Sequence, residues 1–372
     1  MNPDASSPAG ALPAPAQVQP ATLDARAAPL EIRPGSSADD VARDAFVRAH
    51  PRGTFFHQAG WRRAVERVMG HEPADWIAVR GGAIVGVLPL MRAPRWITHG
   101  ALISMPYAVY GGAVGESREV EAALTQAAIA QAERERAGRL ELRCIDDPGL
   151  PLTPSGLYAT FIADLPESVE QVLASMPKKS RAEARKAREK HGLRLTEGIW
   201  YLDDLFRLFQ MNKRSLGSPG LPHAFFWAVA KEFSDSVRVH VVHRGSQPIA
   251  AVMSFLWRGD VLAYYSGTAE DADRNYSASN FMYMALREWS VAHGFKRFDF
   301  GRSRKDSGAF SFKEHQGFTG RDLEYRFHLV RDRHLPSLNP SNPKTQGLRD
   351  TWAKLPLRLT TRLSSTFAPY LP

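Results

Sequence analysis

Cysteine is nearly missing from this chain, whose 372 residues include only Cys144. A single cysteine excludes an internal disulfide and any metal site built from cysteines. Cys144 falls in the strand-like run 140–145, so we expect a buried thiol and not a nucleophile. Such sparing use of cysteine fits a reducing, cytoplasmic compartment.

Long apolar runs are missing too. A membrane-spanning helix needs about 18 consecutive apolar residues, and no segment of the sequence comes near that length. Residues 1–28 are rich in Ala and Pro and have neither the basic nor the apolar region of a signal peptide. We interpret them as a disordered leader. The histidines are scattered, without metal-ligand spacing and without a Ser-His-Asp arrangement, so the sequence predicts no metal site.

Positive charge, by contrast, is in excess. The formal net charge is +9 and the isoelectric point is about 9.7. The excess is concentrated in residues 178–194. A positive field of that density favours an anionic partner, which can be a phosphate group, a nucleic acid or a membrane surface.

The basic segment is predicted to form a helix over residues 178–192. Ser180 and Glu183 have the spacing of a capping box, and Gly192 ends the pattern. Three arginines recur at i, i+4 and i+7, so they share one face, and guanidinium groups suit phosphate oxygens. A solvated helix that joins two domains is an equally good interpretation. The cations expected on this surface are Lys178, Lys179, Arg181, Arg185 and Arg188.

One order of elements occurs twice along the chain. A hairpin around Gly81, a Tyr/Gly-rich segment, a helix over 117–136 and a strand over 139–145 make the first copy. A hairpin around Gly245 opens the second copy, which ends in a strand at 298–300. The pattern predicts two similar α/β (α+β) halves with mixed sheets. The domains expected are the leader 1–28, an N-terminal domain 29–160, a C-terminal domain 161–332 and a tail 333–372.

The chemistry-bearing residues cluster at the end of the second copy. Gly301 breaks a short strand, and a small, basic turn and a short helix ending at Gly317 follow. Asp299 is the candidate base for an attacking amine, and Lys313 is the candidate donor to the oxyanion that forms. The alternative is a structural salt bridge from Asp299 to Arg302 or Lys313. Arg302 and Ser303 are candidates to hold a carboxylate or phosphate of the substrate.

Three segments carry a family resemblance: residues 178–187, 299–303 and 310–318. With them the chain, from about residue 30 to 330, resembles the FemAB family, and most closely its subgroup associated with exosortase/PEP-CTERM exopolysaccharide systems. The resemblance implies two tandem acyl-CoA N-acyltransferase (GNAT)-like domains. It also implies transfer of an acyl or aminoacyl group to an amine of a cell-envelope precursor. The residues it singles out are Phe312 and Lys313, which position the reacting ester, and Lys179, Arg181 and Arg185, which hold phosphates.

The sequence also departs from that family. Gln316 stands where the subgroup usually has Trp. The basic helix is also too short for the coiled-coil arm of some relatives, which argues against extensive tRNA contact. Acyl-CoA-dependent transferases cradle a pyrophosphate on a glycine-containing loop; here that loop reads Arg274-x-x-Ser277-x-Ser279, which argues against CoA. An ordinary helix capped by Ser277 or Ser279 is the alternative interpretation.

We therefore expect a cytoplasmic N-acyltransferase whose active site is bounded by residues 264–267, including Tyr265, by 299–303 and by 312–313. The acceptor would be an amine on a phosphate-bearing envelope or polysaccharide precursor, and the donor is open between aminoacyl-tRNA and acyl-CoA. The tail is predicted either to lie on the inner face of the membrane or to pack back onto the protein. Two other functions stay open: an acetyl-CoA-dependent small-molecule N-acetyltransferase, and a non-catalytic scaffold of a polysaccharide assembly.

Overall fold

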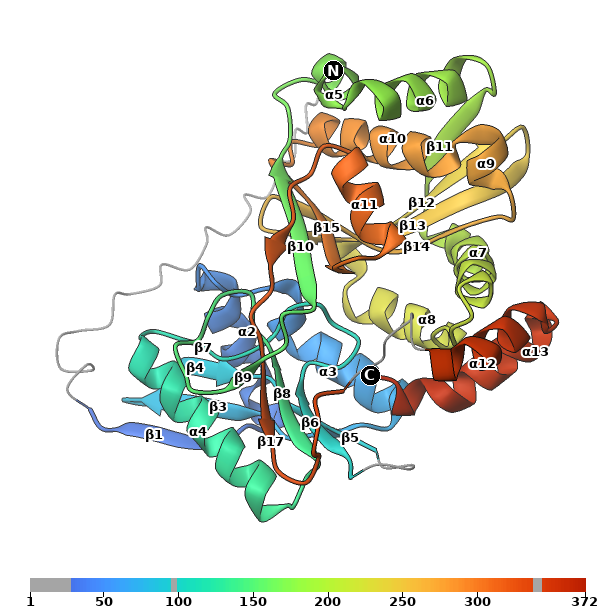
Figure 1. Ribbon diagram of the computed structural model, residues 1–372. Helices are drawn as coiled ribbons and strands as arrows, with labels where there is room; N and C mark the ends of the chain where they lie inside the picture. The colour runs from blue at the N-terminus through green and yellow to red at the C-terminus, as the bar shows by residue number, and fades with distance from the viewer. Residues whose placement is uncertain (1–27, 95–98, 337–342) are drawn as a thin grey trace, which may run out of the picture.

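The computed structural model describes residues 28–94, 99–336 and 343–372, so the predicted leader lies almost wholly outside the described residues. Within them, the strands form sheets of four, six and seven strands. The first half of the chain supplies most of the two smaller sheets, and the later part supplies the largest (Figure 1).

The first half alternates helices with short strands. The four-stranded sheet has the order β1-β3-β4-β7, and the six-stranded sheet has the order β2-β5-β6-β8-β17-β9. The strands are β1 (Leu30–Pro34), β2 (Glu72–Pro73), β3 (Trp76–Arg80), β4 (Ala83–Leu88), β5 (Met91–Ala93), β6 (Ala101–Ser104), β7 (Val114–Gly115), β8 (Arg139–Arg143), β9 (Thr153–Pro154) and β17 (Tyr325–Leu329). The helices are α2 (Asp40–Ala49), α3 (Ala59–Met69) and α4 (Arg118–Arg134).

The second half is built on the seven-stranded sheet, in the order β11-β12-β13-β14-β15-β10-β16. Its strands are β10 (Tyr158–Asp164), β11 (Leu193–Glu197), β12 (Val237–Arg244), β13 (Gln247–Trp257), β14 (Asp260–Thr268), β15 (Arg297–Arg304) and β16 (Arg321–Asp322). Its helices are α5 (Val169–Ser175), α6 (Lys178–Glu189), α7 (Leu202–Ser215), α8 (His223–Glu232), α9 (Ala272–Tyr276), α10 (Ala278–Ala292) and α11 (Gly308–His315).

The predicted order of elements occurs in both halves, although β5 and β7 are additional in the first half and α9 is additional in the second. The hairpins β3–β4 and β12–β13 turn at Gly81 and Gly245, both at positive φ, where glycine lacks the steric penalty of a side chain. Each hairpin is followed by a strand, a long helix and a second strand parallel to the first, which gives the parallel pairs β6–β8 and β14–β15. These parallel pairs make the six-stranded and seven-stranded sheets mixed, as the sequence predicts, whereas all pairs of the four-stranded sheet are antiparallel.

The two halves exchange strands. β10, which leaves the first half, pairs antiparallel with β15, and β17, from the end of the second half, pairs antiparallel with β8 (Figure 1). The six-stranded and seven-stranded sheets are therefore each completed by a strand from the other half of the chain. The domain boundaries at residues 160 and 332 stay a prediction.

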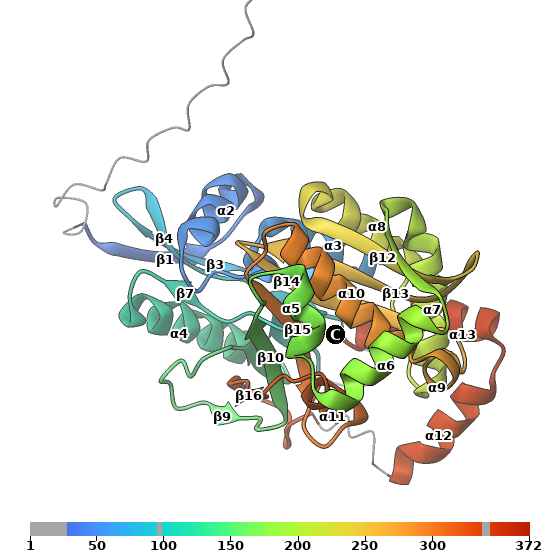
Figure 2. The ribbon, with the colours of Figure 1, turned by 90° about the horizontal axis from the view of Figure 1, so that it is seen from above.

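The large sheet carries a different layer on each face. Phe298 and Phe300 of β15 join an apolar cluster with residues of α5, α6 and α10, and these helices lie over the sheet when it is seen from above (Figure 2). The opposite face packs, with α7 and α8, against aromatic residues of the first half such as Phe55 and Trp61. The second face is therefore the one that meets the first half.

The C-terminal residues return to both halves. In helix α13 (Leu357–Phe367), which follows α12 (Pro343–Lys354), the Ser364 hydroxyl accepts a hydrogen bond from Gly220 N at 3.0 Å. The Tyr107 hydroxyl donates to Ala368 O at 2.8 Å. None of the helices in the described part of the chain combines the length and apolar character of a membrane span. Contact of the tail with a membrane surface stays a prediction.

Two local predictions were wrong. The basic helix α6 begins at Lys178 after Pro177, so Ser180 lies inside it and donates to His315 O instead of forming a capping box with Glu183. The strand expected to stop at Gly301 continues to Arg304, because Gly301 forms an irregularity inside β15 and not its end.

Candidate functional site

Strands β14 and β15 part soon after they meet. Their parallel pairing covers only residues 260–262 and 297–299. Beyond that point the register of β13 against β14 shifts near Tyr264, and the register of β10 against β15 shifts near Gly301, which has a φ of 65°. A bulge adds one residue to a strand and redirects the side chains that follow it. The two bulges therefore shape the place where the strands separate.

The bulge at Gly301 puts Asp299 and Arg302 on one face of the sheet. Ile162 pairs with Asp299 and Thr160 pairs with Arg302, so two residues of β15, 300 and 301, lie opposite one residue of β10, 161. Ile162 and Thr160 are two residues apart and share a face, since side chains alternate along a strand. Without the extra residue, Arg302 would point to the opposite face, away from the first half.

Asp299 is a buried carboxylate held by uncharged donors. Its exposed fraction is 6%. Gly301 N donates to Oδ1 at 2.6 Å, and the Tyr110 hydroxyl lies 3.0 and 2.9 Å from the two carboxylate oxygens. Burial raises the pKa of Asp299 to about 6, although these hydrogen bonds and the charge of Lys313 act in the opposite direction. Neither salt bridge expected for Asp299, to Arg302 or to Lys313, occurs among the ion pairs of the described residues.

Asp299 lines a cavity of about 360 Å³ between the two halves. Phe55, Phe56 and Trp257 give the cavity apolar walls. Its charged rim is largely paired: Arg297 bonds Asp260 at 2.7 Å, and Arg321 lies 3.5 Å from Asp146. A partly apolar cleft lined by a carboxylate with a raised pKa has the features of a site for an amine.

Lys313 lies across the strand from that cavity. Its exposed fraction is 8%, and its ammonium donates to the carbonyls of Phe300, Gly301 and Arg302 at 2.7, 3.0 and 3.1 Å. Burial lowers the pKa of Lys313 to about 7; Asp299 opposes this and Arg302 adds to it. Because all three donors are taken, none is directed at an oxyanion in this conformation. Lys313 instead binds the carbonyls of the bulge.

The other residues predicted around Asp299 are divided between two faces. Arg302 stacks on the ring of Tyr158, with its Cζ 4.4 Å from the centroid. Ser303 is buried, and its hydroxyl has no hydrogen-bond partner among the described residues. Tyr265 lies in the aromatic core, and Phe312 lies on the far face beside Tyr283, with ring centroids 5.7 Å apart. The catalytic and binding roles of these residues stay predictions.

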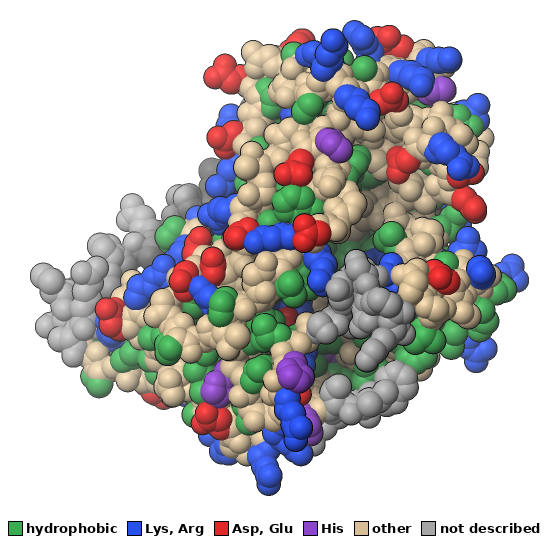
Figure 3. All heavy atoms as spheres, in the orientation of Figure 1, with side chains coloured by type: hydrophobic (Ala, Val, Ile, Leu, Met, Phe, Trp, Pro, Cys, Tyr) green, Lys and Arg blue, Asp and Glu red, His purple; other side chains and the backbone are tan. Residues whose placement is uncertain are grey.

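The basic helix is remote from Asp299. α6 packs on α10 through its small residues Ala184 and Ala187, in the layer that covers the other face of the large sheet. Lys and Arg side chains gather there along the top of the molecule (Figure 3). Lys179 and Arg185 are exposed, and Arg181 donates to Ala174 O at 3.2 Å. Binding of phosphates at this helix stays a prediction, but such a site would be separate from the cavity.

The loop before α10 does not fit a pyrophosphate. The carboxylate of Asp273 accepts from Ser279 N at 2.6 Å and from the Ser279 hydroxyl at 2.9 Å. The Ser277 hydroxyl donates to Glu183 at 2.5 Å. Two carboxylates thus occupy the helix N-terminus, where they are favoured by the same dipole that would favour a phosphate. Asp273 caps the helix instead of the serines, and Arg274 is 74% exposed in an ion pair with Asp271.

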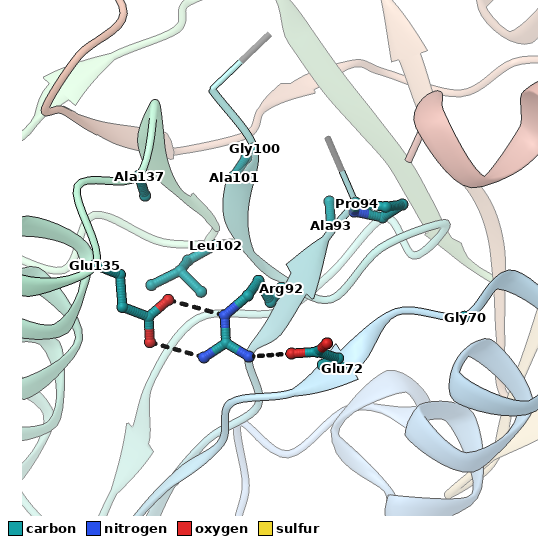
Figure 4. A pocket seen from close by; sticks show the side chains of 10 residues that line it. All are labelled: Gly70, Glu72, Arg92, Ala93, Pro94, Gly100, Ala101, Leu102, Glu135 and Ala137. Carbon is teal, nitrogen blue, oxygen red and sulfur yellow. Dashed lines mark hydrogen bonds and ion pairs between the residues drawn. The ribbon is translucent and has the colours of Figure 1, made fainter. Parts of the chain in front are cut away.

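A second, smaller cavity of about 210 Å³ lies in the first half (Figure 4). The guanidinium of Arg92, which lines this cavity, bonds Glu135 at 2.7 and 2.8 Å and Glu72 at 2.6 Å. Both carboxylates of this cavity are thus paired with the same guanidinium. The cavity therefore has no counterpart of the unpaired Asp299, and we place the candidate site between the halves.

Two residues of the site were missed from the sequence. Tyr110 reaches across from the first half, where its hydroxyl hydrogen bonds Asp299 and also Thr160. Tyr110 belongs to the Tyr/Gly-rich segment of the first repeat, so the repeat contained a signal for it. Thr160 gave no local signal, because only the strand exchange brings β10 beside β15.

Comparisons with known proteins agree with this architecture. Residues 174–314 match the acetyltransferase (GNAT) domain family. The crystal structure of FemX superposes with a TM-score of 0.60 at 12% identity, covering 81% of this chain and 98% of that one. A conserved protein of unknown function from Bacteroides thetaiotaomicron gives 0.53 at 13% identity, over 81% and 99%. A tandem GNAT protein from the clavulanic acid biosynthesis pathway gives 0.50 at 13% identity, over 83% and 100%. No curated protein matches the sequence.

These matches confirm the predicted fold of two tandem GNAT-like domains with mixed sheets. The GNAT match supports an N-acyltransferase and implies an acyl-CoA donor, which the capped N-terminus of α10 does not fit. Identities this low establish the fold alone. Membership of the exosortase/PEP-CTERM-associated subgroup stays a prediction.

Proposed function

We propose that this chain is a FemAB-like N-acyltransferase that moves an acyl or aminoacyl group to an amine of a cell-envelope or exopolysaccharide precursor. The observation that carries the proposal is Asp299, a buried carboxylate without an ion-pair partner among the described residues, in the lining of a cavity between two GNAT-like halves. An amine can attack only after it loses a proton, and a carboxylate with a pKa near 6 is mostly ionised at pH 7 and can accept that proton.

The reaction follows from this placement. The amine nitrogen of the acceptor attacks the carbonyl carbon of an ester or thioester and forms the C–N bond. Asp299 takes a proton from the attacking nitrogen and returns it to the leaving oxygen or sulfur as the C–O or C–S bond breaks, so the alcohol or thiol leaves neutral. No other chemistry is required of the protein than to hold the two substrates and to move that proton.

Lys313 serves this reaction as a positioning residue. Its three hydrogen bonds fix the carbonyls of residues 300–302, and the bulge that these residues form keeps Asp299 and Arg302 on the same face. Its positive charge also acts to lower the pKa of Asp299, which keeps the base ionised. Both effects reach the substrate through Asp299 and not by direct contact.

The donor is the least constrained part of the proposal. The GNAT match favours acyl-CoA, and on that ground an acetyl-CoA-dependent small-molecule N-acetyltransferase is the second candidate function. Asp273 at the N-terminus of α10 favours a donor that needs no pyrophosphate contact there. For this reason no step of the proposed reaction depends on CoA.

A transfer assay separates the candidates. The purified chain is given radiolabelled acetyl-CoA or radiolabelled aminoacyl-tRNA, each with either a nucleotide-diphosphate-linked amino sugar or the free amino sugar, and amide products are identified by mass spectrometry. The proposal predicts an amide on the phosphate-bearing acceptor, and its loss in Asp299→Asn. Transfer from acetyl-CoA to the free sugar alone would favour the second candidate. Absence of transfer in every combination would favour a scaffold.

A further inference from the structure

Helices α12 and α13 form an arm that is attached to the protein along one side. Thr360 and Ser364, one turn apart on α13, are 2% and 1% exposed and lie on the side of the helix that contacts α7. The Ser364 hydroxyl accepts from Gly220 N at 3.0 Å, and the Tyr107 hydroxyl holds the turn after the helix through Ala368 O at 2.8 Å. These contacts fix the orientation of α13, so one side faces the protein and the other faces solvent.

The outer side of α13 carries a leucine between two arginines. Arg358, Leu359 and Arg362 are three or four positions apart and lie on the side of the helix opposite Thr360 and Ser364. All three are exposed, and Leu359 keeps 42% of its surface in solvent. A surface helix ordinarily buries its apolar residues and leaves its hydroxyl side chains outside. The opposite arrangement here means that packing within the described residues does not account for Leu359.

Exposed apolar residues are concentrated on this arm. Ten large hydrophobic residues are exposed in the described part of the chain, and four of them belong to the arm and the turn after it: Leu348, Leu359, Tyr370 and Leu371. A fifth, Leu216, is in contact with the arm, because Arg349 donates to Leu216 O at 3.2 Å. Single exposed leucines are common on protein surfaces, whereas a group of them on one segment marks an interaction surface.

The same arm is strongly basic. Residues 346–372 contain one acid, Asp350, and four cations: Arg349, Lys354, Arg358 and Arg362. Asp350 accepts from Gln346 at 2.7 Å, and none of the four cations forms an ion pair with a carboxylate of the described residues. Basic and hydrophobic side chains lie next to one another over α12 and α13, at the lower right of Figure 3. Cations without counter-charges leave a positive field at this surface, which attracts an anionic partner.

A lipid bilayer that contains anionic lipid fits both properties of the arm. Its headgroups attract lysine and arginine, and the apolar boundary beneath them takes up leucine side chains. A nucleic acid would bind the cations through its phosphates but has no comparable place for an exposed leucine. Helix α6 provides the contrast, because it is also basic but carries none of the exposed large hydrophobic residues of the described chain.

We propose that α12 and α13 form a docking surface for an anionic lipid bilayer, in which Leu359 inserts among the headgroups while Arg358 and Arg362 pair with lipid phosphates. The sequence left two interpretations of the tail, membrane contact and packing onto the protein, and opposite sides of α13 serve the two. The inference does not use the proposed transfer reaction, so either can fail without the other.

Co-sedimentation of the full chain with lipid vesicles tests the surface. Vesicles of phosphatidylcholine alone are compared with vesicles of phosphatidylcholine and phosphatidylglycerol, each at low and at high salt. The chain is expected to bind the anionic vesicles, and high salt is expected to weaken that binding, because it screens the attraction between the arginines and the lipid phosphates. Equal binding to both kinds of vesicle, or binding to neither, would overturn the proposal.

A charge variant asks whether the arm is the surface that binds. Arg358→Gln combined with Arg362→Gln is expected to lower the partition coefficient onto anionic vesicles by about fivefold for each charge removed. Lys186→Gln combined with Lys190→Gln removes two exposed cations at the end of α6 and is the matched control, expected to bind like the wild type. Equal losses in the two double variants would mean that net charge, and not the arm, attracts the vesicles, which would contradict the proposal.

An apolar variant separates a membrane from other partners. Leu359→Gln is expected to weaken vesicle binding about tenfold, since one partly buried leucine is lost from the interface. Val41→Gln, at a valine of α2 that is 85% exposed, is the matched control and should bind like the wild type. If Leu359→Gln binds vesicles unchanged while the arginine variant loses affinity for single-stranded RNA, the surface serves nucleic acid and the proposal is wrong. A wild-type dimer that Leu359→Gln converts to a monomer would assign the surface to a second copy, which would also refute it.

Thermal unfolding shows that these variants report on the surface and not on the fold. Every substituted side chain is exposed, so each variant is expected to keep the Tm of the wild type. A Tm for Leu359→Gln well below that of Val41→Gln would show that Leu359 stabilises the fold, and would contradict its assignment to a docking surface.

Discussion

The two halves of the molecule place an acid at the same point and treat it differently. Glu141 is the third residue of β8 and pairs with Ile103 of the parallel strand β6; Asp299 is the third residue of β15 and pairs with Leu262 of the parallel strand β14. Both carboxylates are buried. The fold therefore offers two equivalent positions for a base, and the neighbouring residues decide which one can act.

Charge partners account for the difference. Burial acts to raise the pKa of Glu141, but the guanidiniums of Arg143, 2.8 Å away, and Arg139 outweigh it, and the pKa is lowered. Asp299 has only uncharged hydrogen-bond donors, so burial prevails and its pKa is raised to about 6. The first carboxylate is a fixed ion, and the second can exchange a proton near neutral pH. Equal fold positions thus need not share a function.

The largest expected effect comes from exchanging the two acids for their amides. Asp299→Asn is expected to lower kcat/KM in the transfer assay by about 10² to 10⁴-fold, the usual contribution of a general base. Glu141→Gln, assayed well below its Tm, is expected to leave kcat/KM almost unchanged, because Glu141 does not line the cavity. Comparable losses in both variants would show that Asp299 and Glu141 do not differ in their contribution to the reaction.

A smaller effect is expected from Lys313→Met, which frees the bulge but leaves the base in place. Loss of alignment is expected to lower kcat/KM by up to about 10²-fold. The pKa of Asp299 is also expected to rise above 6, because the charge that lowers it is removed. In a plot of kcat/KM against pH, the rise on the acid side should therefore move to higher pH. Lys305→Met, which removes a lysine paired with Asp322 on the same segment, should leave that rise unshifted.

The sequence predicted the hairpins and the order of helices and strands, which depend on nearby residues. It missed the bulge and the Tyr110 contact, which depend on residues far away in the chain. Gly81 and Gly245 mark hairpins by themselves, so the order of elements in both halves was correct. Gly301 has the same signal as a strand end, and only its pairing with β10 shows that it is a bulge. Asp299 was named as a base from its motif, whereas its contact with Tyr110 required the two halves to be brought together.

The smallest expected effect is on stability, and it has opposite signs in the two halves. The folded state disfavours ionised Asp299, so its contribution to the free energy of unfolding falls as the pH rises from the ordinary aspartate pKa to about 6, by up to about 3 kcal/mol. The folded state favours ionised Glu141, so stability is lost as the pH falls below the ordinary glutamate pKa.

Urea unfolding between pH 3 and pH 8 measures how the free energy of unfolding changes with pH through each of the two acids. Asp299→Asn should be more stable than the wild type at pH 7, and the advantage should vanish near pH 4. Glu141→Gln should be less stable at pH 7, by about 3 kcal/mol, since it leaves Arg143 buried without its charge partner. The comparison between the halves fails if Asp299→Asn is destabilised at neutral pH to the same extent as Glu141→Gln.

The pH dependence of kcat/KM for the wild-type chain tests most directly whether Asp299 is the base. The profile should rise about tenfold per pH unit below the pKa of a single essential base and level off above it. With Asp299 in that role the break should fall near pH 6. A rate that stays constant from pH 5 to pH 8 would mean that no group with this pKa takes the proton, and the assignment of Asp299 would be wrong.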